Sequence, residues 1–152
     1  MSKINEVEVP LVEDNSTDAE LTIRALKRQG LANDIFHVED GEEALDFVMC
    51  RGKFGERRSD KSLKVILLDL KLPKVNGLEV LKQLKSNPST SHIPVVMLSS
   101  SREDPDIHNA YRLGANSYVV KPVNFLDFIH AVQNAGLYWL QINEQSHLKS
   151  GI

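Results

Sequence analysis

The chain has 152 residues, a length typical of one domain that buries about two-thirds of its surface on folding. A hydrophobic content of 41% and a charged content of 26% are ordinary for a soluble globular protein, and the formal net charge of -3 argues against a nucleic-acid partner. The single cysteine, Cys50, excludes an intramolecular disulfide, and the absence of an 18-residue apolar run or a signal-peptide core predicts a cytoplasmic protein without membrane contact.

The first expected strand is Val7–Val12, which runs into the acidic turn Glu13-Asp14-Asn15. A helix should then begin at Thr17, which with Glu20 forms a capping box. Pro10 lies inside the expected strand, where it cannot donate to a sheet. Pro10 therefore bears on where this strand begins and not on the acidic turn that follows it.

The second expected strand is Ile35–Val38, followed by a helix that Asp40 caps. The polar stretch Arg51–Lys64 contains six basic and two acidic residues, a net charge of +4, and we interpret it as a solvated loop rather than a docking surface. Val65–Leu68 is continuously apolar, which is typical of a strand covered by helices on both faces, and it leads directly into Asp69.

Three further helices and two further strands complete the pattern. A helix over Leu78–Leu84 ends before Asn87-Pro88, a strand over Ile93–Leu98 leads into Ser99, a helix spans Pro105–Leu113, a strand covers Ser117–Val120, and Asn124 caps the last helix. Five strands that alternate with five helices predict an α/β fold, a flavodoxin-like doubly wound parallel sheet in the order 2-1-3-4-5. We expect a single domain over residues 1–152, with its core at about 7–137 and an apolar C-terminal tail.

Chemically active side chains follow four of the expected strands. In a doubly wound sheet the functional crevice lies at the carboxyl ends of the strands. Those ends carry Glu13 and Asp14, Asp69, Ser99 and Lys121. Three carboxylates, a hydroxyl and an ammonium group are therefore expected at one edge.

The acidic turn after the first strand excludes a simple phosphate-binding loop, because two carboxylates would repel an anion unless a cation lay between them. Clustered carboxylate oxygens suit Mg²⁺, and Asp69 could then attack a phosphoryl group as a carboxylate nucleophile. Lys121 and Ser99 would offset charge on the transferred oxygens.

With these residues in place, the chain resembles the receiver domains of two-component response regulators. The resemblance rests on 11–15 (LVEDN), 67–73 (LLDLKLP) with Asn76-Gly77, Ser99-Ser100 and 118–122 (YVVKP). The stretches 72–81 (LPKVNGLEVL) and 136–140 (GLYWL) are similar to those of stand-alone regulators paired with bacterial phytochromes.

The resemblance implies a role for each matching position. Asp69 would accept phosphate from a sensor histidine kinase, with a bacterial phytochrome implied by the narrower similarity, and an unidentified downstream protein would receive the signal. Mg²⁺ would be held by Glu13, Asp14, Asp69 and the Lys71 carbonyl. Lys121 and Ser99 would contact the phosphoryl group, Ser99 and Tyr118 would form the switch, and Pro122 would follow a cis peptide bond.

Two other functions remain open at this point. An aspartate-nucleophile phosphatase would need a second aspartate two residues after Asp69, where this chain has Lys71. A phosphorylation-independent adaptor of the same fold is disfavoured by the intact acidic set.

The C-terminal run Leu137–Ile142 is apolar where a monomer would normally become polar. We interpret this run as the interface of a homodimer, with Tyr138 and Trp139 near its centre. The alternative is that the run folds back onto its own domain.

Overall fold

The computed structural model describes residues 7–28, 30, 34–57, 63–121 and 125–142. The strands are β1 (Val9–Val12), β2 (Ile35–Val38), β3 (Ile66–Asp69), β4 (Val95–Ser99) and β5 (Ser117–Val120), and the helices are α1 (Ser16–Arg28), α2 (Gly41–Val48), α3 (Gly77–Ser86), α4 (Asp104–Arg112) and α5 (Phe125–Leu137). All neighbouring strands pair in parallel in the order β2-β1-β3-β4-β5, which confirms the predicted topology.

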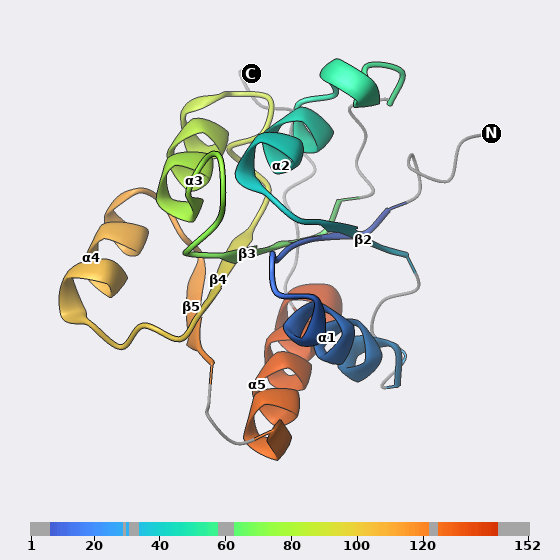
Figure 1. The fold of residues 1–152 in the computed structure, drawn as a ribbon, viewed down its shortest axis with the longest axis vertical. Helices are drawn as coiled ribbons and strands as arrows, with labels where there is room; N and C mark the ends of the chain where they lie inside the picture. Colours follow the sequence, from blue (N-terminus) through green and yellow to red (C-terminus); the bar gives the residue numbers. More distant parts are fainter. Residues whose placement is uncertain (1–6, 29, 31–33, 58–62, 122–124, 143–152) are drawn as a thin grey trace.

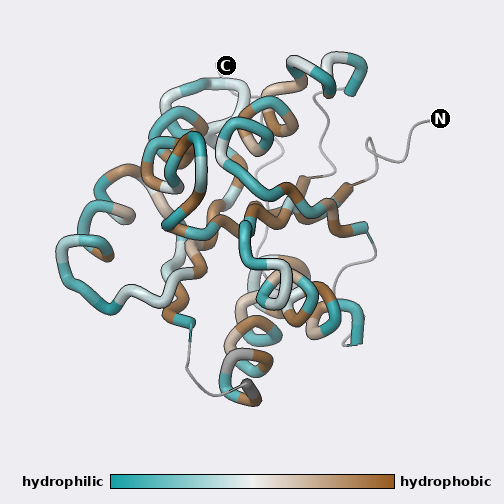
Figure 2. The backbone as a smooth tube through the Cα atoms, in the orientation of Figure 1, coloured by the Kyte–Doolittle hydropathy of each residue, from teal (hydrophilic) through white to brown (hydrophobic). Residues whose placement is uncertain are grey.

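Helices cover both faces of the sheet (Figure 1). Alternate residues of β3 enter different layers: Ile66 and Leu68 pack with α2 and α3, whereas Leu67 packs with α1 and α5. Figure 2 shows the hydrophobic colour along the strands and the hydrophilic colour on the outer turns of the helices. This two-sided burial explains why β3 is apolar at every position before its terminal aspartate.

Strand β1 begins at Val9 rather than at the predicted Val7, and it includes Pro10, which pairs in register with Phe36 of β2. The amides of Val9 and Glu13 donate to β2 and its flanks, so the backbone nitrogen of Pro10 faces the β3 side. The register of β1 with β3 begins only at Leu11. Pro10, which has no N–H to donate, therefore lies at a position of β1 that precedes its pairing with β3.

The predicted start of α1 is wrong. Asn15 caps the helix, because its Oδ1 accepts from the Asp18 amide at 2.9 Å, and the helix begins at Ser16. Thr17 and Glu20 therefore form no capping box. The predicted cap of α2 is confirmed, since Asp40 accepts from the Glu43 amide.

The interpretation of residues 51–64 as a solvated loop is wrong for part of this stretch. A 3-10 turn covers Gly52–Phe54, and Phe54 is buried with its ring edge against Phe36 and Phe47. The Arg57 guanidinium is also buried and stacks over the Phe47 ring at 4.4 Å. Residues 58–62 lie outside the described part of the chain, so the docking alternative remains untested.

The apolar C-terminal run, Leu137–Ile142, continues beyond the end of α5 in helical form. A π-helical turn, Tyr138–Ile142, extends the helix. Trp139 packs against the apolar layer between the sheet and helices α1 and α5. Its Nε1 donates to the Ser117 hydroxyl of β5 at 3.1 Å. Leu137 and Tyr138 are 42% and 46% exposed. The two outer residues, unlike Trp139, thus remain available to a partner.

Within the described ranges, no helix has both the length and the apolarity needed to cross a membrane.

Candidate functional site

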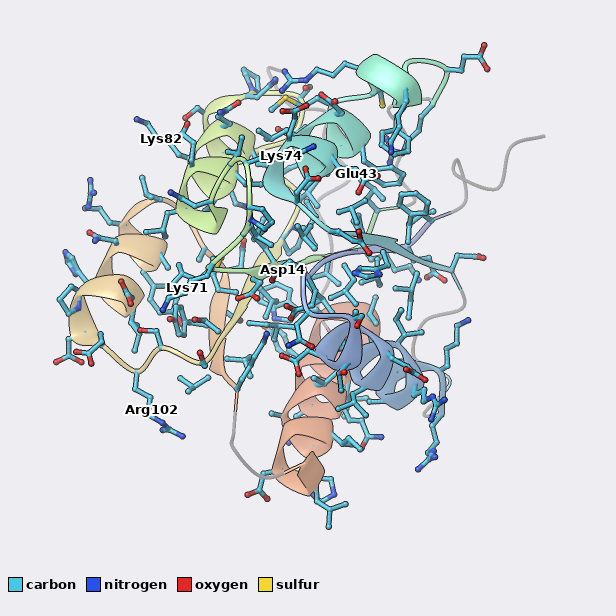
Figure 3. The ribbon with its side chains drawn as sticks, in the orientation of Figure 1. Asp14, Glu43, Lys71, Lys74, Lys82 and Arg102 are labelled. Atoms are coloured by element: carbon cyan, nitrogen blue, oxygen red, sulfur yellow. The ribbon has the colours of Figure 1, made fainter. Side chains whose placement is uncertain are left out.

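The parallel sheet brings the predicted residues to one edge. Glu13 and Asp14 follow β1, Asp69 and Ser99 are the last residues of β3 and β4, and Lys121 follows β5. Figure 3 labels Asp14 on the loop after β1, and Lys71 on the loop after the neighbouring strand β3. The expected convergence of Lys121 with the acidic residues is confirmed by direct contacts.

The Lys121 ammonium group contacts several carboxylates at this edge. Its Nζ lies 2.5 Å from Glu13 Oε1 and 3.3 Å from Asp69 Oδ2. A third carboxylate that we did not predict, Asp18 in the first turn of α1, lies 3.1 Å from the same nitrogen. The Lys121 side chain is only 11% exposed, so these ion pairs are largely shielded from solvent.

Burial makes the charges at this edge interdependent. It raises the pKa of Glu13 to about 8, helped by a hydrogen bond with Asp69 and opposed by Lys121. Burial also acts to lower the pKa of Lys121, but the hydrogen bond with Glu13 and the charge of Asp69 outweigh it and raise that pKa above its ordinary value. A cation at this edge would relieve the repulsion between the two acids.

The residues present fit a hard divalent cation. Oxygens of Glu13, Asp14 and Asp69 lie within 4.8 Å of one another, and this is the only such cluster of metal-binding side chains in the described ranges. Glu13 and Asp69 are buried, whereas Asp14 is exposed, so the cluster opens to solvent on one side. Carboxylates that leave room for waters and phosphate oxygens suit Mg²⁺.

Lys71 follows Asp69 by two residues, and its amide lies 3.4 Å from Asp69 Oδ1. The backbone of residue 71 therefore passes next to the acidic cluster, while its side chain is exposed. This course of the chain is compatible with the predicted use of the Lys71 carbonyl as a ligand.

The two predicted switch residues are linked through Ser101. The Ser101 amide donates to Ser99 Oγ at 3.1 Å, and the Tyr118 hydroxyl donates to the Ser101 carbonyl at 3.1 Å. The Ser101 hydroxyl in turn donates to Asp106 of α4 at 2.5 Å. The loop after β4 thus joins the end of that strand to both β5 and α4.

Pro122 lies outside the described residues, so the predicted cis peptide bond stays a prediction. Ser101 and Asp18 were missed because each acts through its backbone or its place in the fold rather than through a strand-end motif. Asp18 lies in the first turn of α1, three residues after the acidic turn Glu13-Asp14-Asn15, and this closeness in the sequence was the available signal. His37 was also missed: its Nε2 lies 2.7 Å from the Glu13 carbonyl.

Comparisons with known proteins address the family. Residues 9–133 match the model of the response regulator receiver domain. The probable methanogenesis regulatory protein FilR2 of Methanothrix harundinacea is 42% identical over 88% of this chain and 83% of its own length. Response regulator Rcp1 of Synechocystis is 35% identical over 86% of this chain and 87% of its own length.

Solved structures show the same architecture. The phosphorylated cyanobacterial phytochrome response regulator RcpA has a TM-score of 0.85 and 34% identity, covering 92% of this chain and 98% of that chain. The Mn²⁺-bound form of Rcp1 has a TM-score of 0.83 and 33% identity, covering 91% and 99%. The bacteriophytochrome response regulator RtBRR has a TM-score of 0.73 and 48% identity, covering 94% and 86%.

Proposed function

The chain belongs to the response regulator receiver-domain family, and we propose that it accepts a phosphoryl group on Asp69 from a sensor histidine kinase and signals by protein–protein contact. The observation that carries this proposal is the position of Lys121 Nζ between Glu13 and Asp69 at the carboxyl end of the sheet. We propose that residues 1–152 act as a single receiver domain, with the core at about 7–137.

In the proposed reaction, one carboxylate oxygen of Asp69 attacks the phosphorus of a phosphohistidine. The new bond is the P–O bond of an acyl phosphate, and the P–N bond to the imidazole breaks with its electron pair passing to the nitrogen. Asp69 is suited to this step because it ends a rigid buried strand and is still 9% exposed. The rigid strand holds the nucleophile in place.

Glu13, Asp14, Asp69 and the Lys71 carbonyl are the groups that would hold Mg²⁺, which would supply positive charge to the phosphoryl oxygens. Lys121 supplies a second positive charge from the carboxyl end of β5, and Ser99 supplies a hydroxyl. Burial, and after it the neighbouring Asp69, raises the pKa of Glu13, and the positive charges of this set would favour its ionised form.

Ser99 and Tyr118 are proposed as the switch. Ser99 is 2% exposed, and its Oγ is engaged only through the Ser101 amide among the described contacts, so it could turn toward a new phosphoryl oxygen. Tyr118 is tied to the same residue, Ser101, which supports coupling between the two side chains.

The upstream partner is proposed to be a kinase of the bacterial phytochrome class, because the similar proteins RcpA and RtBRR are named as phytochrome and bacteriophytochrome response regulators. The phosphatase alternative is weakened by Lys71, whose exposed side chain stands where a second aspartate would be needed. The contacts of Lys121 with Glu13 and Asp69 favour a site that handles phosphate over an adaptor that needs none.

The test is phosphoryl incorporation from a small acyl-phosphate donor, with Mg²⁺ present or chelated. We expect close to one phosphoryl group per chain with Mg²⁺ and a drop of about tenfold or more in rate after chelation, because three clustered carboxylates otherwise repel the donor. Intact-mass measurement gives the stoichiometry. Absence of incorporation with Mg²⁺ would favour the adaptor, and steady release of free phosphate without a stable adduct would favour the phosphatase.

We also propose a homodimer formed through the C-terminal run, with Tyr138 and Trp139 in or beside the interface. Leu137 and Tyr138 are exposed apolar side chains at the end of α5, which supports a contact there. Trp139 packs on its own domain and would hold the neighbouring Tyr138 in position at the interface.

Sedimentation should show a dimer on the order of tens of micromolar, an ordinary affinity range for such contacts. Tyr138→Ala should shift the protein toward monomer. Tyr111→Ala is the matched control, because Tyr111 is a 50% exposed tyrosine on α4. A wild-type chain that stays monomeric in this range would rule the dimer out.

A further inference from the structure

Asp18 occupies a position that normally serves its own helix. It is the third residue of α1 after the cap Asn15, and an acidic side chain at this position usually accepts from the backbone amide of the cap. Here that amide belongs to another acceptor, because Asn15 N donates to Glu13 Oε2 at 3.2 Å. The Asp18 carboxylate is thus released from its usual local contact.

The released carboxylate reaches across the sheet edge to Lys121, 103 residues away in the sequence, with its Oδ2 3.1 Å from Nζ. The backbone of Asp18 is held meanwhile, since its carbonyl accepts from the buried Thr22 hydroxyl at 2.8 Å. The fixed backbone of α1 therefore directs the Asp18 side chain toward Lys121.

Lys121 has three N–H donors, and three carboxylates contact its nitrogen: Glu13, Asp18 and Asp69. Two of these acceptors have another task in the proposed reaction. Glu13 and Asp69 belong to the cluster that fits a cation, and Asp69 is also the nucleophile. Asp18 is outside that cluster, so its oxygens stay free for Lys121.

We propose that Asp18 is a positioning residue that keeps the Lys121 ammonium beside Asp69 when the oxygens of Glu13 and Asp69 are engaged elsewhere. The inference rests on the proposed function and adds a residue to it. Without Asp18, the flexible lysine stem would lose its one independent anchor, and the positive charge would be delivered less accurately to the phosphoryl oxygens.

A simpler role for Asp18 would be to complement the positive end of the α1 dipole. Such a role requires no contact with Lys121 and would be equally served by an acid pointing into solvent. The side chain of Asp18 is only 33% exposed and points to a nearly buried ammonium group. The two roles predict different effects on Lys121 itself.

The first arm of the test observes Lys121 in the full chain without Mg²⁺ or a phosphoryl donor. The ammonium resonance, assigned by its loss in Lys121→Arg, is compared by ¹⁵N-edited NMR in wild type, Asp18→Asn and Glu20→Gln. Glu20 is the matched control on α1, since it pairs with Arg24 at the surface. We expect a shifted resonance with faster proton exchange in Asp18→Asn alone, and an unchanged resonance would overturn the proposal.

The second arm measures phosphoryl incorporation as a function of donor concentration with Mg²⁺ present. Asp18→Asn should lower the maximal rate about tenfold with little change in the half-saturating donor concentration, because position and not binding is impaired. A maximal rate within twofold of wild type, or an equal fall in Glu20→Gln, would overturn the proposal. If the wild type incorporates nothing, the proposed function fails, and the NMR arm still decides whether Asp18 holds Lys121.

Discussion

Asp69→Asn is expected to abolish phosphoryl incorporation, leaving less than about 1% of the wild-type level, because a neutral amide is a poor nucleophile and cannot yield the acyl phosphate. The substitution keeps the size of the side chain and removes the Asp69 carboxylate, which adds to the effect of burial in raising the pKa of Glu13. The fold should therefore be at least as stable as in the wild type. Intact-mass analysis after exposure to the donor measures the first effect, and urea unfolding measures the second.

The matched control is Asp104→Asn, which removes an exposed carboxylate from the first turn of α4. It should label at the wild-type rate. Normal labelling of Asp69→Asn would show that the phosphoryl group resides elsewhere, and would refute the assignment of the acceptor while leaving the family intact.

Gly77→Ala is expected to destabilise the fold by about 1–3 kcal/mol, although alanine is the better helix former by about 1 kcal/mol. A Cβ at this first residue of α3 would lie 2.2 Å from the Asp69 carbonyl oxygen and 2.7 Å from that of Leu70. Both obstacles are backbone atoms, so β3 or α3 must shift. Labelling should fall as well, since the displaced backbone is that of the acceptor residue.

Gly55→Ala serves as the comparison, because its new Cβ would lie 3.3 Å from the Gly52 carbonyl oxygen and would require a smaller shift. Urea unfolding of both variants gives the two free energies. A Gly77→Ala variant as stable as wild type would mean that the close approach of α3 to the end of β3 can relax without cost.

The sheet could be predicted because its signals are local and repeated. Val65–Leu68 is apolar at every position, and a strand of that kind must be covered on both faces. The edge where Glu13, Asp69 and Lys121 meet followed from the parallel direction of the strands alone.

The parts that were missed depend on tertiary contacts. Asn15, and not Thr17, caps α1: its Oδ1 accepts from the Asp18 amide, and its own amide donates to the Glu13 carboxylate. Phe54 and Arg57 are buried in a stretch of high charge because Phe47 offers a ring to both of them. Asp18 was overlooked because its partner Lys121 lies 103 residues later in the chain.

Pro10 has a consequence for how the chain assembles. A slip of β1 by one residue against β2 would turn the proline nitrogen toward β2, leaving a carbonyl of that strand without a donor. The same slip would exchange the residues that face the two helical layers, with Leu11 and Val12 each moved to the other side. A misaligned β1 would therefore lose a hydrogen bond and also misplace its core side chains. The proline thus favours the correct register of β1 while the sheet is still forming.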